Sequence, residues 1–197
     1  MTEWQKAQAG YMFDAIFDKE IVDMRDKCME LCREYNNCKP SEKEKKNEIL
    51  HKMLGHIEGD ISVMPPFHCD YGFNISVGKN FYCNFNCAIL DSAKVTFGDN
   101  VFIAPNCVFS PAGHAIDREL RAKGYEIALP ITVGDDVWFG ANVTVLPGVT
   151  IGSGTIIGAS SVVTKDIPSG VIAGGNPCRV LREITEKDKN KYPFFEE

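Results

Sequence analysis

His114 is the histidine whose surroundings best suit catalysis. It lies in a stretch of about 20 residues, SPAGHAIDRELRAKGYEIALP, which separates two segments of regular repeat. Histidine ionises near neutral pH, so an imidazole in a projecting loop can act as a general base. The same pattern also fits a surface histidine, or a structural flap that packs on a neighbouring subunit.

Eight cysteines form the second set of reactive side chains. The spacings Cys28/Cys32 and Cys83/Cys87 are not the Cys-x-x-Cys pairs typical of zinc sites, so we interpret the cysteines as small core hydrophobes. Five of them receive no role from the sequence: Cys28, Cys32, Cys38, Cys69 and Cys178.

From about residue 61, apolar residues recur every six positions. A period of six fits neither an amphipathic helix nor a flat strand. It fits a coil of short strands with glycine or asparagine at the corners, in which three sides close a rung of about 18 residues. The predicted inward positions are Val77, Cys83, Ile89, Val95, Phe97, Ile103, Phe109, Val133, Phe139, Val145, Ile151, Ile157 and Val163. The same register places Cys87 and Cys107 inside the coil.

The residues before this repeat predict helices. Thr2 with Gln5, and Ser41 with Glu44, fit capping boxes, and apolar residues follow each box at helical spacing. We therefore predict a mainly β protein with three parts. These are a helical arm over 1–60, a β-helix over 61–180 with an excursion loop at 111–130, and a tail over 181–197.

Composition narrows the class of protein. The chain has 197 residues with 44% hydrophobic and 24% charged residues, which is typical of a soluble globular protein. The net charge of −6 argues against a non-specific nucleic-acid binder. The sequence shows no signal-peptide pattern and no membrane-spanning apolar run, and we expect a cytoplasmic location with reduced thiols.

Several segments resemble the sugar O-acetyltransferases of the hexapeptide-repeat acyltransferase family. They are AGYMFDA, FHCDYGFNISVGKNFYCNFNCAILD, AGHAIDREL, ITVGDDVWFGANVTVLPGVTIG and SVVTKDIPSGVIAGGNPCRVLREI. The CDYG and GNPCR portions are closer to maltose than to galactoside acetyltransferases. The resemblance implies a left-handed parallel β-helix and a homotrimer with active sites between subunits. It also implies acetyl-CoA as donor and no metal in the reaction.

The resemblance also assigns roles to individual residues. It implies His114 as the general base, with Asn84 helping to orient the site. The implied acceptor contacts are Asp14, Asp70, Tyr82, Asn84, Asp91 and Ser92, with Asp18 as the alternative to Asp14. The implied coenzyme contacts are Trp138, Ala141, Ala159, Thr164, Lys165, Arg179 and Arg182.

Three positions depart from the family pattern. Ala115 stands where proline usually follows the catalytic histidine, which affects the stiffness of the loop. Ala141 replaces the serine of galactoside enzymes, so only its backbone N–H can serve there. Asp70 likewise replaces a galactoside-type serine, which weakens a galactoside assignment.

The expected reaction is direct transfer of the acetyl group to a hydroxyl of a sugar such as maltose or glucose. One alternative keeps the fold and donor but uses an antibiotic, a lipo-oligosaccharide or an amino-acid hydroxyl as acceptor. Another is a zinc hydrase built on the same repeats, which needs three histidines; the chain has His51, His56, His68 and His114. The third is a non-catalytic trimeric binding protein.

Overall fold

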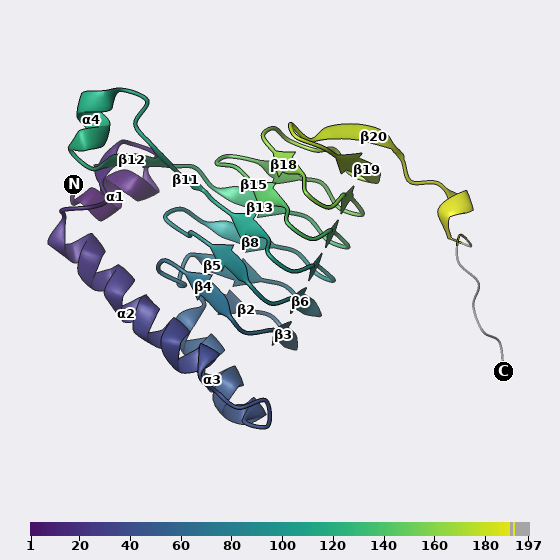
Figure 1. Cartoon of the computed structure of the whole chain (residues 1–197), viewed down its shortest axis with the longest axis horizontal. Coiled ribbons are helices and arrows are strands. Elements are labelled where there is room, and N and C mark those ends of the chain that lie inside the picture. The colour runs from purple at the N-terminus through teal and green to yellow at the C-terminus, as the bar shows by residue number, and fades with distance from the viewer. Residues whose placement is uncertain (190, 192–197) are drawn as a thin grey trace.

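The predicted parallel β-helix is confirmed by a computed structural model, which describes residues 1–189 and 191 (Figure 1). The coil has three faces, each a stack of parallel strands. Face A contains β2 (His56–Ile57), β5 (Ile75–Val77), β8 (Val95–Phe97), β13 (Ile131–Val133) and β16 (Thr150–Ile151). Face B contains β3 (Ile61–Val63), β6 (Phe81–Cys83), β9 (Phe102–Ile103), β14 (Trp138–Phe139), β17 (Ile156–Ile157) and β19 (Val171–Gly174), followed by the antiparallel β20 (Arg179–Glu183). Face C contains β4 (Phe67–Cys69), β7 (Cys87–Ile89), β10 (Val108–Phe109), β15 (Thr144–Val145) and β18 (Val162–Val163).

The six-residue register fixes the core. Every predicted inward position is at most 2% exposed, and so are Cys87 and Cys107. Phe109 stacks edge-on between Phe97 and Phe139, with ring centroids 4.9 and 5.1 Å apart. Because side chains alternate along each short strand, outward residues of successive coils lie above one another in columns.

Two kinds of residue turn the corners. The left-handed conformation is adopted by asparagine at several corners, as at Asn86 (φ 59°), Asn106 (φ 63°) and Asn142 (φ 59°) between faces B and C, and by glycine at others, such as Gly154 (φ 66°). Other glycines, such as Gly152, have ordinary backbone angles. Glycine is needed there because the next coil approaches too closely to leave room for a side chain. A Cβ on Gly152 would lie 2.4 Å from the backbone nitrogen of Ser169.

The helical arm covers the end of the coil that holds β2, β3 and β4 (Figure 1). It contains α1 (Glu3–Gln8), α2 (Lys19–Asn36) and α3 (Lys43–Met53). Asn36 accepts a hydrogen bond from the Phe67 backbone N–H and donates one to the Phe67 carbonyl, both at 2.9 Å. The arm thereby covers strand edges that would otherwise be free to pair with another chain.

Two details of the predicted arm need adjustment. The Thr2–Gln5 capping box is confirmed, but the Ser41–Glu44 box is wrong, because α3 begins at Lys43 with Glu42 at its N-cap and no side-chain cap. The coil begins at β2, so its first strand lies inside the predicted arm. No helix of the described residues is long and apolar enough to cross a membrane.

The excursion leaves the coil after β10 and returns at β13, so it projects from the corner between faces C and A. It folds into β11 (Ala112–His114), α4 (Arg118–Ala122) and β12 (Tyr125–Ala128). The arm adds β1 (Phe13–Asp14) to this hairpin, which gives an antiparallel sheet in the order β1-β12-β11. At the other end, β20 runs into the predicted tail, where a 3₁₀ turn spans Glu186–Asp188. The remainder of that tail lies outside the described residues, except for positions 189 and 191.

The close approach of coils at Gly152 predicts a stability effect. We expect Gly152→Ala to lower the free energy of unfolding by about 2 kcal/mol, because the added methyl group forces two coils apart. Gly113→Ala is the control, since its Cβ would meet nothing closer than 3.9 Å, and should change stability by less than about 0.5 kcal/mol. Chemical denaturation of both variants measures the difference; equal stabilities would contradict the close-packing account.

Candidate active site

His114 is held at the end of the excursion hairpin, opposite Glu126 of β12. Its Nε2 atom lies 3.5 Å from Oε1 of Glu126, and its side chain is 52% exposed. The next residue, Ala115, is buried, and its N–H donates to the Tyr125 carbonyl at 3.1 Å. Proline has no N–H and could not make this bond, so a backbone hydrogen bond restrains the loop at the position where the resemblance implies a proline.

Glu126 gives the imidazole an acidic partner. Burial raises the pKa of the Glu126 carboxyl, while the positive charges of His114 and Arg25 act to lower that pKa. A carboxylate beside an imidazole stabilises the imidazolium that forms when the ring accepts a proton. The pair therefore has the chemistry of a general base with a charged partner.

The two arm aspartates differ in their surroundings. Asp14 pairs with Tyr125 in the small sheet that carries His114, and its carboxylate accepts the N–H groups of Ile16 and Phe17. Asp18 caps α2, because its carboxylate accepts the Ile21 N–H at 3.1 Å. Asp14 is therefore the aspartate that lies in the same sheet as the histidine.

Asp70 follows β4 at the corner from which the excursion projects, one coil below Asp91. Burial, together with the negative charge of Asp91, raises the pKa of Asp70 to about 6, against the opposing charge of Arg25. Asp70 can thus exchange a proton close to neutral pH, which suits a group that binds a hydroxyl.

Asp91, a predicted acceptor contact, is enclosed by backbone. It is fully buried, and its carboxylate accepts the N–H groups of Asp70, Tyr71 and Asn74 at 3.1, 2.8 and 3.2 Å. These bonds occupy the carboxylate with backbone, so the geometry makes Asp91 a residue that positions Asp70. Ser92 is also buried, and its carbonyl accepts a bond from Gln8 of α1.

A second hydrophobic cluster ties the arm, the corner and the excursion together. It is separate from the interior of the coil and includes Phe13 of β1, Ile21 of α2 and Ala128 of β12. Tyr71 belongs to it, with its ring 5.0 Å from that of Trp4. Because each of these elements contributes, the cluster fixes His114 relative to Asp70.

The remaining acceptor residues lie elsewhere on the coil. Tyr82 points outward from β6 on face B, and Asn84 follows at the corner between faces B and C. The side-chain oxygen of Asn84 accepts the Phe85 N–H at 2.8 Å, which orients its amide. Strand register then places Tyr82, Phe102, Trp138, Ile156, Ile172 and Arg182 in one outward column of face B.

The predicted coenzyme residues divide between the same two regions. Ala141 and Ala159 stack at the corner of Asn84, where the Ser160 N–H donates to the Ala141 carbonyl at 2.8 Å. Arg179 and Arg182 lie on β20, at the end of face B, and Arg182 makes two bonds to Asp188. Thr164 and Lys165 follow β18, at the corner between faces C and A.

The predicted site residues therefore form two groups on one chain. Group one lies at the C–A corner with the excursion and contains His114, Asp14, Asp70, Asp91, Ser92, Thr164 and Lys165. Group two lies on face B and the B–C corner and contains Tyr82, Asn84, Trp138, Ala141, Ala159, Arg179 and Arg182. One side of the triangle separates them, at most about 20 Å for six extended residues.

Sequence reasoning missed two charged residues that act on members of group one. Glu126 faces His114 across the hairpin, and the positive charge of Arg25 acts on both Asp70 and Glu126. After α4, the sequence YEIA alternates apolar and polar residues, which predicts a strand. Such a strand could have placed Glu126 opposite the histidine. No sequence pattern identifies Arg25 as a site residue, because it lies among several other charged residues in the sequence of α2.

Two family models match the chain. The maltose acetyltransferase hexapeptide capping motif matches residues 6–59, and the bacterial transferase hexapeptide (six repeats) matches residues 130–165. A putative acetyltransferase of Saccharomyces cerevisiae is 49% identical over 91% of both chains.

Solved structures of high similarity have the same fold. A galactoside acetyltransferase in complex with coenzyme A has a TM-score of 0.94 at 43% identity, covering 98% of this chain and 96% of that one. A maltose O-acetyltransferase from Clostridium difficile has a TM-score of 0.91 at 45% identity, with 94% and 99% covered. The chain belongs to the hexapeptide-repeat acetyltransferases of the maltose and galactoside type, and its coil is the left-handed β-helix of that family. The sequence identities to the two solved structures, 43% and 45%, are too similar to assign the chain to the maltose rather than the galactoside enzymes.

The raised pKa of Asp70 predicts a pH dependence of stability. A carboxyl whose folded pKa is raised stabilises the fold below its unfolded pKa, and this contribution is lost as pH rises towards the folded pKa. We expect the stability of the parent to fall relative to Asp70→Asn between about pH 4 and pH 6, by on the order of 2 kcal/mol. Chemical denaturation at several pH values tests this, and curves that stay parallel across the window would contradict it.

Proposed function

We propose that this acetyltransferase moves an acetyl group from acetyl-CoA to a hydroxyl of a sugar such as maltose or glucose, with His114 as the general base. The observation that carries the proposal is His114 beside Glu126 on the hairpin of a chain that matches a coenzyme A-bound galactoside acetyltransferase over 98% of its length.

The reaction needs no covalent enzyme intermediate, because a thioester is already activated. The neutral imidazole of His114 accepts the proton of the acceptor hydroxyl as its oxygen attacks the thioester carbonyl carbon. The tetrahedral intermediate then breaks its carbon–sulfur bond, and the departing thiolate takes the proton from the imidazolium. Glu126 stabilises that imidazolium while it exists.

Other groups orient the acceptor and stabilise charge. Asp70, together with Asp14, is proposed to bind acceptor hydroxyls beside His114. Tyr82 and the oriented amide of Asn84 complete the acceptor contacts. The backbone N–H of Ala141 is the proposed donor to the oxyanion of the intermediate.

The coenzyme is proposed to lie along the outward column of face B. Trp138 is 53% exposed there, beside Ala141 and Ala159, whose small side chains leave room for a pantetheine chain. Lys165, Arg179 and Arg182 supply cations for the phosphates at the nucleotide end, and Thr164 a hydroxyl. These three cations thus make the proposed nucleotide end of the site locally positive, although the protein as a whole has a net charge of −6.

We infer a homotrimer in which group one of one subunit faces group two of the next. General-base catalysis requires the base within hydrogen-bond reach of the reacting hydroxyl, while one side of the coil separates His114 from Asn84 on a single chain. A closed threefold arrangement repeats the same contact three times and makes each site composite. All eight cysteines are free thiols, which supports a cytoplasmic location.

Replacement of the base gives the direct kinetic test. We expect His114→Ala to lower kcat/KM for acetyl transfer by about 10²–10⁴-fold, because the hydroxyl loses its proton acceptor. Stabilisation of the variant against heat by acetyl-CoA should be retained. His56→Ala, at an exposed position of β2, is the matched control and should keep parent activity. Near-parent turnover by the His114 variant would remove His114 from the role.

A panel of acceptors distinguishes the proposal from its alternatives. We expect turnover with maltose or glucose to exceed turnover with serine and with hydroxyl-bearing antibiotics. Asp70→Ser should lower the preference for maltose over a galactoside, since it restores the galactoside-type residue. Coenzyme A release measured for each acceptor gives the ranking. Turnover confined to antibiotics or amino acids contradicts the sugar assignment. Absence of turnover together with no thermal stabilisation by acetyl-CoA favours a non-catalytic binding protein.

A further inference from the structure

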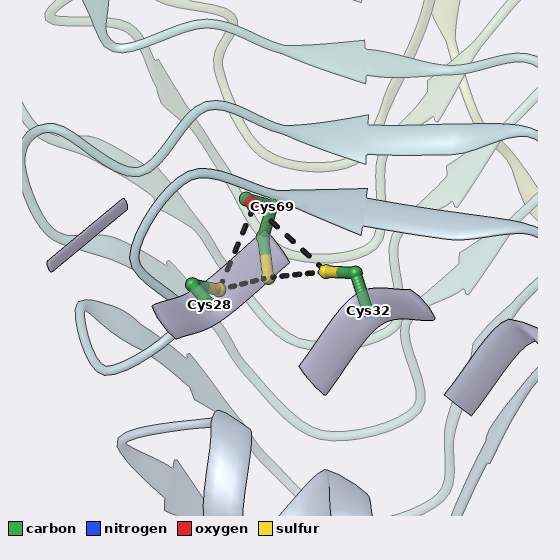
Figure 2. Close-up of side chains that lie close together, drawn as sticks. All are labelled: Cys28, Cys32 and Cys69. Carbon is green, nitrogen blue, oxygen red and sulfur yellow. Dashed lines mark hydrogen bonds between the residues drawn. The ribbon is translucent and has the colours of Figure 1, made fainter. Parts of the chain in front are cut away.

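Three cysteines meet where α2 packs on β4. Cys28 and Cys32 are four residues apart on α2, so their side chains leave the same face of the helix. Cys69 is the last residue of β4. Figure 2 shows their sulfur atoms converging: Sγ of Cys69 lies 3.4 Å from that of Cys28 and 3.8 Å from that of Cys32. All three sulfurs lie within 4.8 Å of one another.

The surrounding contacts fix this arrangement. The side chains of Cys28, Cys32 and Cys69 are at most 4% exposed. One turn beyond Cys32, the paired bonds of Asn36 to Phe67 hold the helix to the strand that carries Cys69. The cluster is thus preformed by two elements that pack rigidly together, in the way that a metal site needs.

The spacing of the sulfurs matches that of metal-bound thiolates. With metal–sulfur bonds of about 2.3 Å, two thiolates on one ion lie about 3.8 Å apart at a tetrahedral angle and about 4.0 Å apart at a trigonal one. Two of the three pairs, at 3.4 and 3.8 Å, are already close to these separations. Small shifts of the side chains would therefore suffice for binding.

The donor set favours a soft ion of low coordination number. Within the described residues the group comprises these three thiols and no nitrogen or carboxylate ligand. A further sulfur donor is the thioether of Met53, whose Sδ lies 3.6 Å from Sγ of Cys32. Thiolates and thioethers suit Cu(I), whereas a structural zinc site is completed by a fourth strong ligand.

An ion can reach the cluster through a groove between α2 and face C. The groove has a volume of about 640 Å³ and is lined by Cys32, Cys69, Met29 and His68, among others. Two of the three thiol residues thus border open space, although their sulfurs are shielded from bulk water.

We propose that Cys28, Cys32 and Cys69 bind one Cu(I) ion per chain as three thiolates. On binding, each thiol loses its proton to solvent and forms a sulfur–copper bond, and copper keeps its oxidation state. The ion joins α2 to β4 directly beside Asp70, so it stabilises the attachment of the arm to the coil.

Titration of the reduced, metal-free, full-length protein tests this proposal. Cu(I) is added without oxygen in competition with bicinchoninate, a coloured Cu(I) chelator. We expect one Cu(I) per chain and a higher Tm on binding. Cys69→Ala should weaken binding by at least about 100-fold, and Cys28→Ala should do the same if Cys69→Ala does not fold.

Cys38→Ala is the matched control, because Cys38 is a buried thiol just beyond α2 and outside the cluster. It should keep the affinity of the parent. Equal binding by the Cys38 and Cys69 variants would overturn the proposal, as would no binding at all. Tighter binding of Zn(II) than Cu(I) in a parallel titration contradicts the copper assignment. A Cys28–Cys69 disulfide in air, with no metal bound by the reduced protein, contradicts the metal site.

Discussion

The six-residue side of the coil is the constraint on which the rest of the structure depends. Inward side chains at every sixth position fix the register between coils, because a shift of one residue would turn the buried set outward. With the interior fixed, outward residues of successive coils stack in columns and corner residues stack at three edges. Residues far apart in sequence, such as Tyr82, Trp138 and Arg182, are aligned in this way.

The same coil cannot by itself place the histidine. His114 lies on an excursion, and its position depends on the small β1-β12-β11 sheet and on the second hydrophobic cluster. Through these contacts the helical arm has two roles. It covers the open end of the coil, and it brings Asp14 and Arg25 towards the corner that holds Asp70.

The sequence alone was sufficient to predict those parts of the fold that follow from the six-residue period or from a local motif. The inward positions, the excursion and the Thr2 cap follow from spacing alone, because each depends on residues close in the chain. Contacts between distant segments could not be read in this way. The enclosure of Asp91 by backbone N–H groups, the partner Glu126 and the meeting of Cys69 with Cys28 and Cys32 depend on which corner or helix face approaches another. The predicted Ser41 capping box was wrong because α3 begins at Lys43, one residue later than a Ser41 cap requires.

The division of the proposed site into two groups on one chain is the central claim of this account. Mixed trimers of His114→Ala and Asn84→Ala subunits test it most directly, since each variant alone lacks one half of every site. Equal mixing should restore about a quarter of parent activity, because that fraction of interfaces joins two intact halves. Mixtures no more active than either variant alone would place both residues on the same subunit of each site and contradict the account.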